Sequence, residues 1–211
     1  MPLKKSALKN SRLYLILDKT ACGRKNTKRI LKRALQGGVD IVQFRDKFSS
    51  TKKMAQEARR LLPLCRKYHV PFIINDRLEV ALQVNADGLH IGQEDMPPSL
   101  ARKILGKEKI IGLSCHSIEQ IKRAQKEKCD YMGFGPVFRT ATKPDVRPIG
   151  VGAFIKALKV SSKPIFAIGG ITESRIFELF VPGKTRIAVC RELCLDKNIA
   201  KKAKRLKMRV S

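Results

Sequence analysis

The sequence predicts a single (β/α)8 barrel of the TIM-barrel class. Eight short apolar runs of strand length alternate with amphipathic segments of helical length along the 211 residues, and this alternation is typical of a parallel α/β fold. Eight such units in about 200 residues fit a small closed barrel. A doubly wound open sheet is the alternative, but the glycines lack the G-x-G-x-x-G order of a dinucleotide-binding fold.

The first half of the chain contains four predicted strand–helix units. Apolar runs bounded by turn residues predict strands buried on both faces, at 13–17, 41–44, 72–74 and 88–91. Apolar residues spaced three and four apart predict helices, at 27–36, 51–68, 78–84 and 98–105. Gly37 and Gly38 end the first of these helices, as glycines commonly do.

The second half repeats this pattern with one long interruption. Strands are predicted at 110–113, 131–134, 165–168 and 186–190, and helices at 118–126, 153–158, 172–180 and 198–207. A polar connection, 139–150, separates the sixth strand from the next helix. We therefore expect one domain over 1–211, with a basic N-terminal extension at 1–12 and a basic closing helix within 195–211.

Composition indicates a globular protein of a reducing compartment. Hydrophobic residues make up 43% of the chain and charged residues 30%, a balance that allows a large core. No apolar run approaches the length of a membrane span, and the basic N-terminus lacks the apolar region of a secretory signal. The six cysteines form no C-x-x-C pair, so the cytoplasm is the expected location.

The chain is strongly basic, with 45 lysines and arginines against 18 acidic residues and a net charge of +27. Such a surface attracts anions, either phosphorylated metabolites or nucleic acid. The basic residues are spread over nearly every predicted helix, and neither a zinc finger nor an RNP-type aromatic motif accompanies them. A general basic bias therefore explains the charge better than a specific nucleic-acid site.

Polar side chains follow directly after the predicted strands, where a barrel carries its functional residues. They are cations, carboxylates, hydroxyls and glycines, the groups that bind a phosphorylated substrate and Mg²⁺. The candidates are Gln43, Arg45 and Lys47 after the second strand, Asn75 and Asp76 after the third, Asp95 after the fourth, Ser114 after the fifth, Thr140, Thr142 and Lys143 after the sixth, and Gly169 and Gly170 after the seventh.

Asp76 and Asp95 follow successive predicted strands, so both carboxylates face the same side of the barrel. Mg²⁺ in proteins usually takes one or two carboxylates and leaves its other positions to water and substrate phosphates. A structural explanation is equally open, in which Asp76 caps the following helix and Asp95 lies in a turn before Pro97.

The other candidates have structural alternatives as well. Gly169 and Gly170 lead into a predicted helix, where backbone N–H groups can bind a phosphate, although two glycines also suit a plain tight turn. Arg45 and Lys47 have the alternative of solvated loop charges. His90 lies on an apolar strand, which favours a packed core histidine over a ligand or a base.

Six sequence blocks resemble the motifs of the thiamine-phosphate synthase family, in its order and at its approximate spacing. They are VQFRDK at 42–47, IINDR at 73–77, DGLHIGQED at 87–95, GLSCHS at 112–117, GFGPVFRTATKPD at 133–145 and AIGGIT at 167–172. The resemblance covers roughly residues 13 to 193. The AIGGI block alone recurs in many phosphate-binding barrels, whereas the six blocks together are specific.

The resemblance implies a transferase that joins 4-amino-2-methyl-5-hydroxymethylpyrimidine diphosphate to 4-methyl-5-(2-phosphoethyl)thiazole, giving thiamine phosphate and pyrophosphate. It implies that Asp76 and Asp95 hold Mg²⁺. The implied contacts to the pyrimidine diphosphate are Gln43, Arg45, Lys47, Asn75, Ser114 and Lys143, of which Lys47, Lys143 and Ser114 are the catalytic candidates. Thr140, Thr142, Gly169 and Gly170 would bind the thiazole phosphate.

Loss of pyrophosphate would leave a cation delocalised into the electron-rich aminopyrimidine, which the thiazole nitrogen then attacks. Such a reaction needs neutralisation of a departing polyanion and a nucleophile held nearby. It needs neither a nucleophilic side chain nor a general base.

Two departures from the family pattern concern the thiazole half of the site. The family usually has a small-residue segment of the type GVAVVSAI at the eighth strand, where this chain has RIAVCREL at 186–193. Cys190 and Arg191 therefore stand where backbone and serine would meet the phosphate, and Arg191 either pairs with the phosphate or fills its site. Arg139 replaces a usual proline beside the thiazole loop.

Three competing functions follow from these residues. One is a degenerate or specificity-altered relative, because of Arg191. Another is the related thiazole tautomerase, but that branch lacks the carboxylate pair and has its catalytic histidine where Pro136 stands. A nucleic-acid-binding barrel is the non-enzyme alternative. We therefore expect small phosphorylated pyrimidine and thiazole substrates as partners, and we expect neither a membrane nor a nucleic acid. A homo-oligomer is left open.

Overall fold

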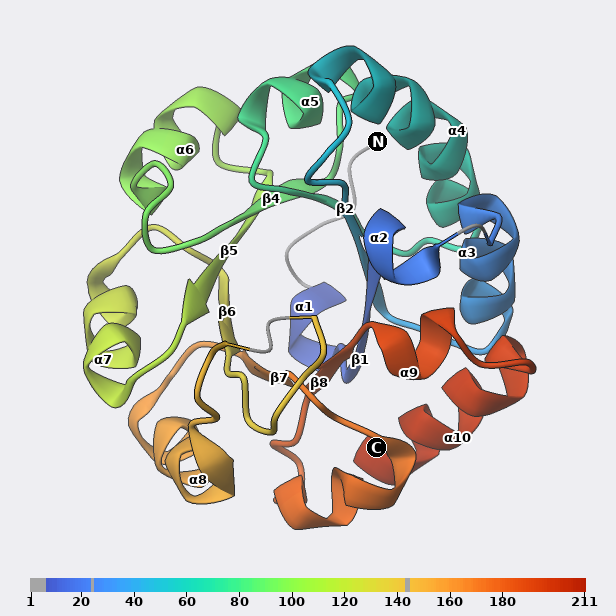
Figure 1. Cartoon of the computed structure of the whole chain (residues 1–211). Helices are drawn as coiled ribbons and strands as arrows, with labels where there is room; N and C mark the ends of the chain where they lie inside the picture. Colours follow the sequence, from blue (N-terminus) through green and yellow to red (C-terminus); the bar gives the residue numbers. More distant parts are fainter. Residues whose placement is uncertain (1–6, 24, 143–144) are drawn as a thin grey trace.

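A computed structural model describes residues 7–23, 25–142 and 145–211, and in it eight parallel strands form a closed barrel (Figure 1). Each strand pairs with its neighbours in sequence, and the first pairs with the last. The fold class predicted from the sequence is confirmed. The strands are β1 Leu13–Asp18, β2 Ile41–Arg45, β3 Phe72–Asn75, β4 Gly88–Ile91, β5 Ile110–Cys115, β6 Tyr131–Phe134, β7 Ile165–Ile168 and β8 Ile187–Val189.

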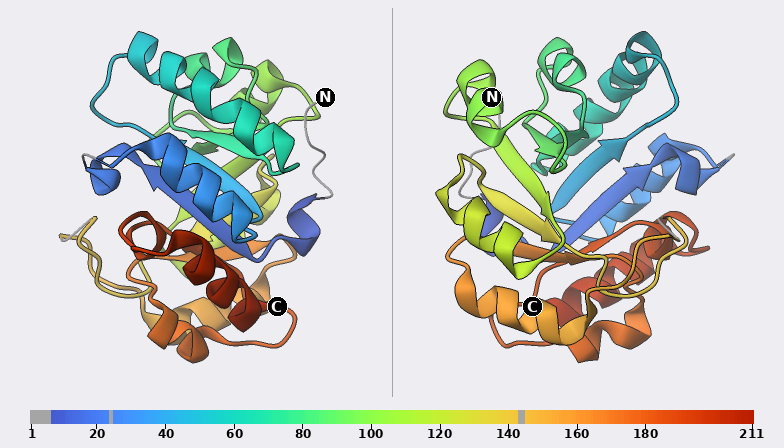
Figure 2. Two further views of the ribbon diagram at one scale, coloured as in Figure 1. Left: turned by 90° about the vertical axis from the view of Figure 1, so that its right-hand side faces the viewer. Right: turned by 60° about the vertical axis from the view of Figure 1, so that its left-hand side comes forward.

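Helices surround the barrel and agree closely with the predicted segments. They are α3 Thr27–Gln36, α4 Thr51–Lys67, α5 Leu78–Gln83, α6 Pro98–Leu105, α7 Ile118–Lys126, α8 Gly150–Val160 and α10 Ile199–Val210. In Figure 2, α10 packs beside α3, so the last helix closes against the first unit of the barrel. Within the described ranges, no helix is long and apolar enough to cross a membrane.

Several details differ from the prediction. The segment predicted as a helix at 172–180 is a 3-10 helix, η1 Glu173–Leu179, and α8 begins at Gly150, three residues before its predicted start. Three short helices were not predicted, namely α1 Ala7–Asn10, α2 Lys19–Cys22 and α9 Arg191–Cys194. Each has only four residues, which is too few to show helical periodicity in a sequence.

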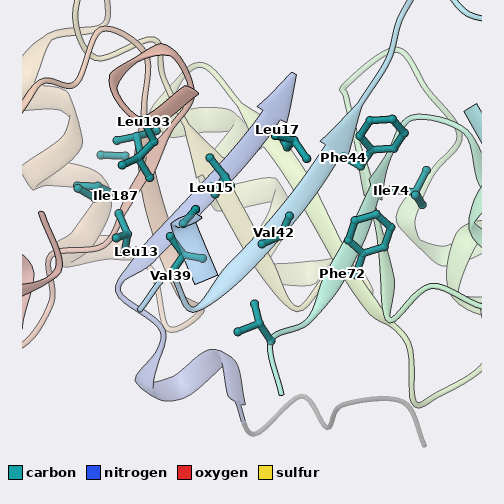
Figure 3. Packing of buried hydrophobic residues seen from close by; sticks show 14 of the residues in the cluster. Leu13, Leu15, Leu17, Val39, Val42, Phe44, Phe72, Ile74, Ile187 and Leu193 are labelled. Carbon is teal, nitrogen blue, oxygen red and sulfur yellow. The ribbon is translucent and has the colours of Figure 1, made fainter. Parts of the chain in front are cut away.

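The strands carry two separate apolar layers because successive side chains point to opposite faces. The outward side chains of Leu13, Leu15 and Leu17 belong to the large core between the strands and the helices, part of which Figure 3 shows. Tyr14 and Ile16, the alternate residues of the same strand, belong to a smaller cluster inside the barrel. The inner cluster fills the barrel below the carboxyl ends of the strands, and a cavity opens above it.

The beginning of the described chain closes the other end of the barrel. Leu8 of α1 is buried and belongs to the inner cluster, and Figure 1 shows α1 at the centre of the ring of strands. The carboxylate of Asp40 accepts hydrogen bonds from the N–H groups of Arg12 and Leu13, each at 2.9 Å. Asp40 also forms an ion pair with Lys207 of α10, which ties the first strand to the last helix.

Candidate active site

A cavity of about 550 Å³ opens at the carboxyl ends of the strands, where barrel enzymes bind their substrates. Most of the residues predicted from the sequence line this one cavity. They are Gln43, Arg45, Asn75, Ser114, Thr140, Thr142, Gly169, Gly170, Cys190 and Arg191. Segments separated by more than a hundred residues in the chain thus contribute to the same site.

Three of the remaining predicted residues lie outside the cavity wall. Lys47 is exposed in the loop after β2, and Asp76 and Asp95 follow β3 and β4 at the rim. Lys143 lies outside the described residues. The guanidinium of Arg77 donates hydrogen bonds to the carbonyl oxygens of Ser49, at 2.7 Å, and Lys47, at 3.4 Å. The loop that carries Lys47 is therefore tied to the rim that carries Asp76.

The rim carboxylates are close enough to influence each other. Burial, followed by the negative charge of Asp95, raises the pKa of Asp76, while Lys47 and Arg45 oppose this shift. Asp76 has a φ of +63°, and its N–H donates to the carbonyl oxygen of His90 at 2.8 Å. A half-buried carboxylate beside a second one is stable when a cation or a proton offsets the repulsion.

The sequence left open that Asp76 caps a helix and that Asp95 lies in a turn, and only the second of these structural roles is found. Arg77, not Asp76, is the N-cap residue of α5, and no side chain caps that helix. Asp95 does accept a hydrogen bond from the N–H of Gly92 at 2.6 Å, as expected of a turn aspartate. Among the described residues, no group of three or more His, Cys, Asp or Glu side chains could hold a metal, so the rim offers only this pair.

Asp18 holds Arg45 in place and was not predicted from the sequence. Its side chain is only 2% exposed and forms an ion pair with the guanidinium of Arg45. The other carboxylate oxygen accepts from the N–H of Ala21 at 2.9 Å and caps α2. One cavity-lining arginine is thereby fixed at the end of β2, and a bidentate guanidinium is well suited to phosphate oxygens.

A continuous set of hydrogen bonds crosses the cavity floor. Gln43 donates from Nε2 to the Tyr14 hydroxyl at 2.9 Å, and this hydroxyl lies 2.7 Å from that of Tyr131. The Tyr131 hydroxyl lies 2.9 Å from Nδ1 of His90, whose Nε2 lies 2.9 Å from Oγ of Ser114. The prediction that His90 is a buried core residue is confirmed, since it is 7% exposed. Its polar contacts were not foreseen.

Gly169 and Gly170 occupy positions that require glycine. Their φ values are +94° and +62°, a region that L-residues rarely adopt. A Cβ on Gly169 would lie 2.4 Å from Cβ of Pro136, and one on Gly170 would lie 2.3 Å from the carbonyl oxygen of Arg139. This close packing holds the loop after β6 against the turn after β7.

Backbone hydrogen bonds strengthen this arrangement. The N–H of Val137 donates to Ile168 at 2.8 Å, and the N–H of Phe138 donates to Gly169 at 3.1 Å. Thr140 and Thr142 therefore lie on the loop beside the glycine turn. Since η1 is a 3-10 helix of seven residues, a phosphate here would be bound by the N–H groups of the turn and not by an α-helix dipole.

The departures from the family pattern lie at the cavity mouth. Cys190 is the N-cap residue of α9 and is partly buried, whereas Arg191 is exposed. The next residue, Glu192, accepts hydrogen bonds from the N–H of Glu173 and from Nζ of Lys202, each at 3.0 Å. The Glu192 carboxylate is thus already paired, which leaves Arg191 as the charged group of α9 that can reach a ligand.

Sequence reasoning missed several residues of the cavity wall, including Tyr14, Asp18 and Phe166. Tyr14 and Phe166 lie within strands and not after them, so a search of strand ends could not find them. The signal available for these two was alternation, since every second strand residue points into the barrel.

Comparison with known proteins identifies relatives over nearly the whole chain. A family model described as thiamine monophosphate synthase matches residues 13–193. The thiamine-phosphate synthase of Persephonella marina is 42% identical over 195 residues, covering 92% of this chain and 93% of the relative. Thiamine-phosphate synthase 1 of Aquifex aeolicus is 40% identical over 198 residues, covering 94% and 92%.

Solved structures agree with these relatives. The thiamine phosphate pyrophosphorylase from Pyrococcus furiosus superposes with a TM-score of 0.86 at 33% identity, over 97% of each chain. A geranylgeranylglyceryl phosphate synthase from Thermoplasma acidophilum reaches a TM-score of 0.69 at 12% identity, over 97% of this chain and 95% of the other. The second likeness concerns the barrel fold alone.

Proposed function

Because the chain belongs to the thiamine monophosphate synthase family, we propose how its own residues carry out that family's reaction. The enzyme is a transferase that forms thiamine phosphate from a small phosphorylated pyrimidine and a small phosphorylated thiazole. One observation supports the assignment of its residues. The cavity has polar side chains from β2, β3 and β5 on one side and the glycine turn after β7 on another, so it can accept two substrates together.

The pyrimidine diphosphate would bind at the ends of β2, β3 and β5. Gln43, Asn75 and Ser114 supply uncharged polar groups to the cavity, which suit a heteroaromatic ring. Arg45, held by Asp18, supplies a charge for the diphosphate. Lys47 and Lys143 would complete the positive surroundings of the leaving group, Lys47 from the loop that Arg77 fixes.

Mg²⁺ would bind at Asp76 and Asp95. The raised pKa of Asp76, caused by burial and by the charge of Asp95, supports this assignment because a cation would offset the repulsion between the carboxylates. Two carboxylates are few enough for Mg²⁺, which usually keeps water and substrate phosphate oxygens as its other ligands. When bound, the ion would neutralise charge on the departing pyrophosphate.

The thiazole phosphate would bind on the opposite side, between the glycine turn and the loop after β6. The N–H groups of Gly169 and Gly170 and the hydroxyls of Thr140 and Thr142 are suitable donors for phosphate oxygens. We propose that Arg191 adds an ion pair at the mouth and does not fill the site, because it is exposed while it lines the cavity. Cys190 would form part of the wall beneath it.

The reaction would then proceed by dissociation. The cations around the diphosphate stabilise the charge that develops as the bond to pyrophosphate breaks. The cavity holds the thiazole nitrogen close to the carbon that becomes positive, which removes the entropic cost of bringing two molecules together. None of these steps requires a side chain to act as a nucleophile or as a base.

Two further expectations remain part of the proposal. We propose a cytoplasmic location, because the six cysteines are free thiols and five of them are buried, as in proteins of reducing compartments. We also propose that the surface charge serves to attract phosphorylated substrates and not nucleic acid.

A coupling assay tests the assignment. Both substrates are incubated with the purified protein, with and without Mg²⁺, while thiamine phosphate and pyrophosphate are followed together. We expect both products in equal amounts and only with Mg²⁺. Pyrophosphate without thiamine phosphate would mean that the site around Arg191 no longer accepts the thiazole, and absence of both products would contradict the residue assignments.

A further inference from the structure

The hydrogen-bonded set beneath the cavity connects two candidate substrate contacts that are far apart in the sequence. It runs from Gln43 through Tyr14, Tyr131 and His90 to Ser114, and we call these five residues the floor chain. They come from β2, β1, β6, β4 and β5. The two ends, Gln43 and Ser114, both line the cavity.

The middle of the floor chain is buried and closely packed. Tyr14 is 2% exposed, Tyr131 is fully buried and His90 is 7% exposed. A Cβ on Gly112 would lie 2.3 Å from the Tyr131 hydroxyl and 2.4 Å from Nδ1 of His90, so the glycine makes room for that contact. Burial raises the pKa values of both tyrosines, and each hydroxyl therefore keeps the one proton that it can donate.

These protons can be arranged consistently in only two ways. With Gln43 donating from Nε2 and a neutral imidazole, the Tyr14 proton goes to Tyr131, the Tyr131 proton goes to Nδ1 of His90, and Nε2–H of His90 donates to Ser114, along the contacts of the floor chain. In the opposite arrangement every one of these bonds is reversed. Any mixture directs two donors at one tyrosine hydroxyl and leaves the proton of that hydroxyl without a partner in the floor chain, which is costly in a buried site.

The ends of the floor chain consequently have opposite hydrogen-bonding character. In the arrangement in which Gln43 donates from Nε2, its Oε1 is left to accept and Ser114 has its hydroxyl proton left to donate. A 4-aminopyrimidine offers an amino donor next to a ring-nitrogen acceptor, which matches such a pair. A 4-oxopyrimidine offers a carbonyl acceptor next to a ring N–H donor, which matches the reverse.

We propose that Tyr131 is a positioning residue, which fixes His90 in the Nε2–H tautomer and thereby sets the donor and acceptor ends of the floor chain for an aminopyrimidine. The proposal rests on the proposed function, since it takes Gln43 and Ser114 as contacts to the pyrimidine. Tyr131 itself acts only through His90 and Tyr14. The substrate class that the floor chain selects is the amino-substituted ring over its oxo counterpart.

Nitrogen-15 NMR of the histidine side chains tests the tautomer directly. The chain has three histidines, His69, His90 and His116, so labelled imidazoles give few signals and two of them act as internal references. We expect His90 to show a protonated Nε2 and an unprotonated Nδ1 in the wild type. In Tyr131→Phe this preference should be lost while the other two histidines stay unchanged. A protonated Nδ1 in the wild type, or an unchanged His90 in the variant, would overturn the proposal.

Steady-state kinetics, measured while each substrate is varied in turn, test whether the floor chain sets the specificity for the aminopyrimidine. In Tyr131→Phe, kcat/KM for the aminopyrimidine substrate should fall about 10- to 100-fold, as expected for one misdirected buried hydrogen bond, and the KM for the thiazole should stay unchanged. Discrimination against the 4-oxo analogue, measured by competition, should fall as well. Equal losses for both substrates, with discrimination intact, would indicate a merely structural role and refute the proposal.

Two further variants complete the design. Tyr68→Phe is the matched control, because Tyr68 lies at the end of α4 beside a second cavity at the amino ends of the strands, and it should change nothing. Tyr14→Phe breaks both the link to Gln43 and the link to Tyr131. The Tyr131 proton is then no longer oriented from Gln43, so both the His90 tautomer preference and the discrimination should weaken. Wild-type protein without synthase activity would contradict the proposed function, whereas the NMR comparison would still decide the role of Tyr131.

Discussion

Gly170→Ala tests whether the turn after β7 and the loop after β6 act together on the thiazole phosphate. The φ of Gly170 is +62°, and an added Cβ would lie 2.3 Å from the carbonyl oxygen of Arg139. Ordinary contact begins near 3.4 Å, so the loop that carries Thr140 has to move by about 1 Å. Gly106→Ala is the matched control, since Gly106 has a φ of +81° with nothing within 4 Å of the added atom.

Both substitutions place an alanine at a positive φ, but only Gly170→Ala also creates a steric clash with the backbone. Alanine held at a positive φ loses roughly 1–3 kcal/mol of stability, and each kcal/mol lowers the Tm of a chain of this size by about 2–4 °C. Gly170→Ala should lose a further 1–3 kcal/mol or so, because a backbone segment must be displaced. A displacement of about 1 Å in a substrate-positioning group can cost about 100-fold in rate, so kcat/KM for the thiazole phosphate should fall to that extent.

Thermal unfolding and steady-state kinetics with each substrate varied separate these effects. Gly106→Ala should lower the Tm modestly and leave both KM values unchanged. Gly170→Ala should have the lower Tm of the two and a selective defect toward the thiazole. If Gly170→Ala matched Gly106→Ala in both measurements, neither the steric argument nor the phosphate site at this turn would stand.

The remaining predictions concern single charges. Asp76→Asn should abolish Mg²⁺-dependent turnover and the rise in Tm that Mg²⁺ gives the wild type. Unchanged activity would rule out the metal assignment. The control is Glu94→Gln, in the exposed loop beside Asp95. Arg191→Ala should raise the KM for the thiazole phosphate about tenfold, the usual size of a charged hydrogen bond, whereas a lower KM would mean that the side chain fills the site. Hydrogen bonds from Arg205 and Lys202 lower the pKa of Glu173 to about 2. Between the ordinary glutamate pKa and about 2, the folded state therefore binds fewer protons than the unfolded state. The wild type should be more stable than Glu173→Gln at neutral pH, and this difference in stability should disappear as the pH falls from the ordinary glutamate pKa towards about 2. A difference in Tm between the two proteins that is independent of pH would contradict this.

The sequence by itself determined the barrel. Strands buried on both faces are apolar throughout, whereas helices on the outside are apolar on one side only. Continuous apolar runs therefore alternate along the chain with segments of helical periodicity. The boundaries of long elements agreed closely, as at α3 and α7. The strand ends also followed from the pattern, and most of the site residues predicted there, such as Gln43 and Ser114, line the cavity.

Elements without periodicity could not be predicted in this way. The four residues of α2 and of α9 make about one turn each, which is too short for an apolar face to repeat. The helix α2 is capped locally by Asp18, whereas α9 is held by a distant partner, since Glu192 accepts a hydrogen bond from the N–H at the start of η1. The 3-10 geometry of η1 likewise has no signal in its residue pattern.

Only the tertiary structure decided which polar residues act together. Tyr14 and Tyr131 are 117 positions apart, yet their hydroxyls meet at 2.7 Å, because closing the barrel turns their side chains inward at similar depth. In the sequence, each is simply an aromatic residue in an apolar strand, and His90 is a core histidine. Strand spacing reveals which face a side chain is on, but hydrogen bonds across the barrel depend on register and closure, and these exist only in the folded chain.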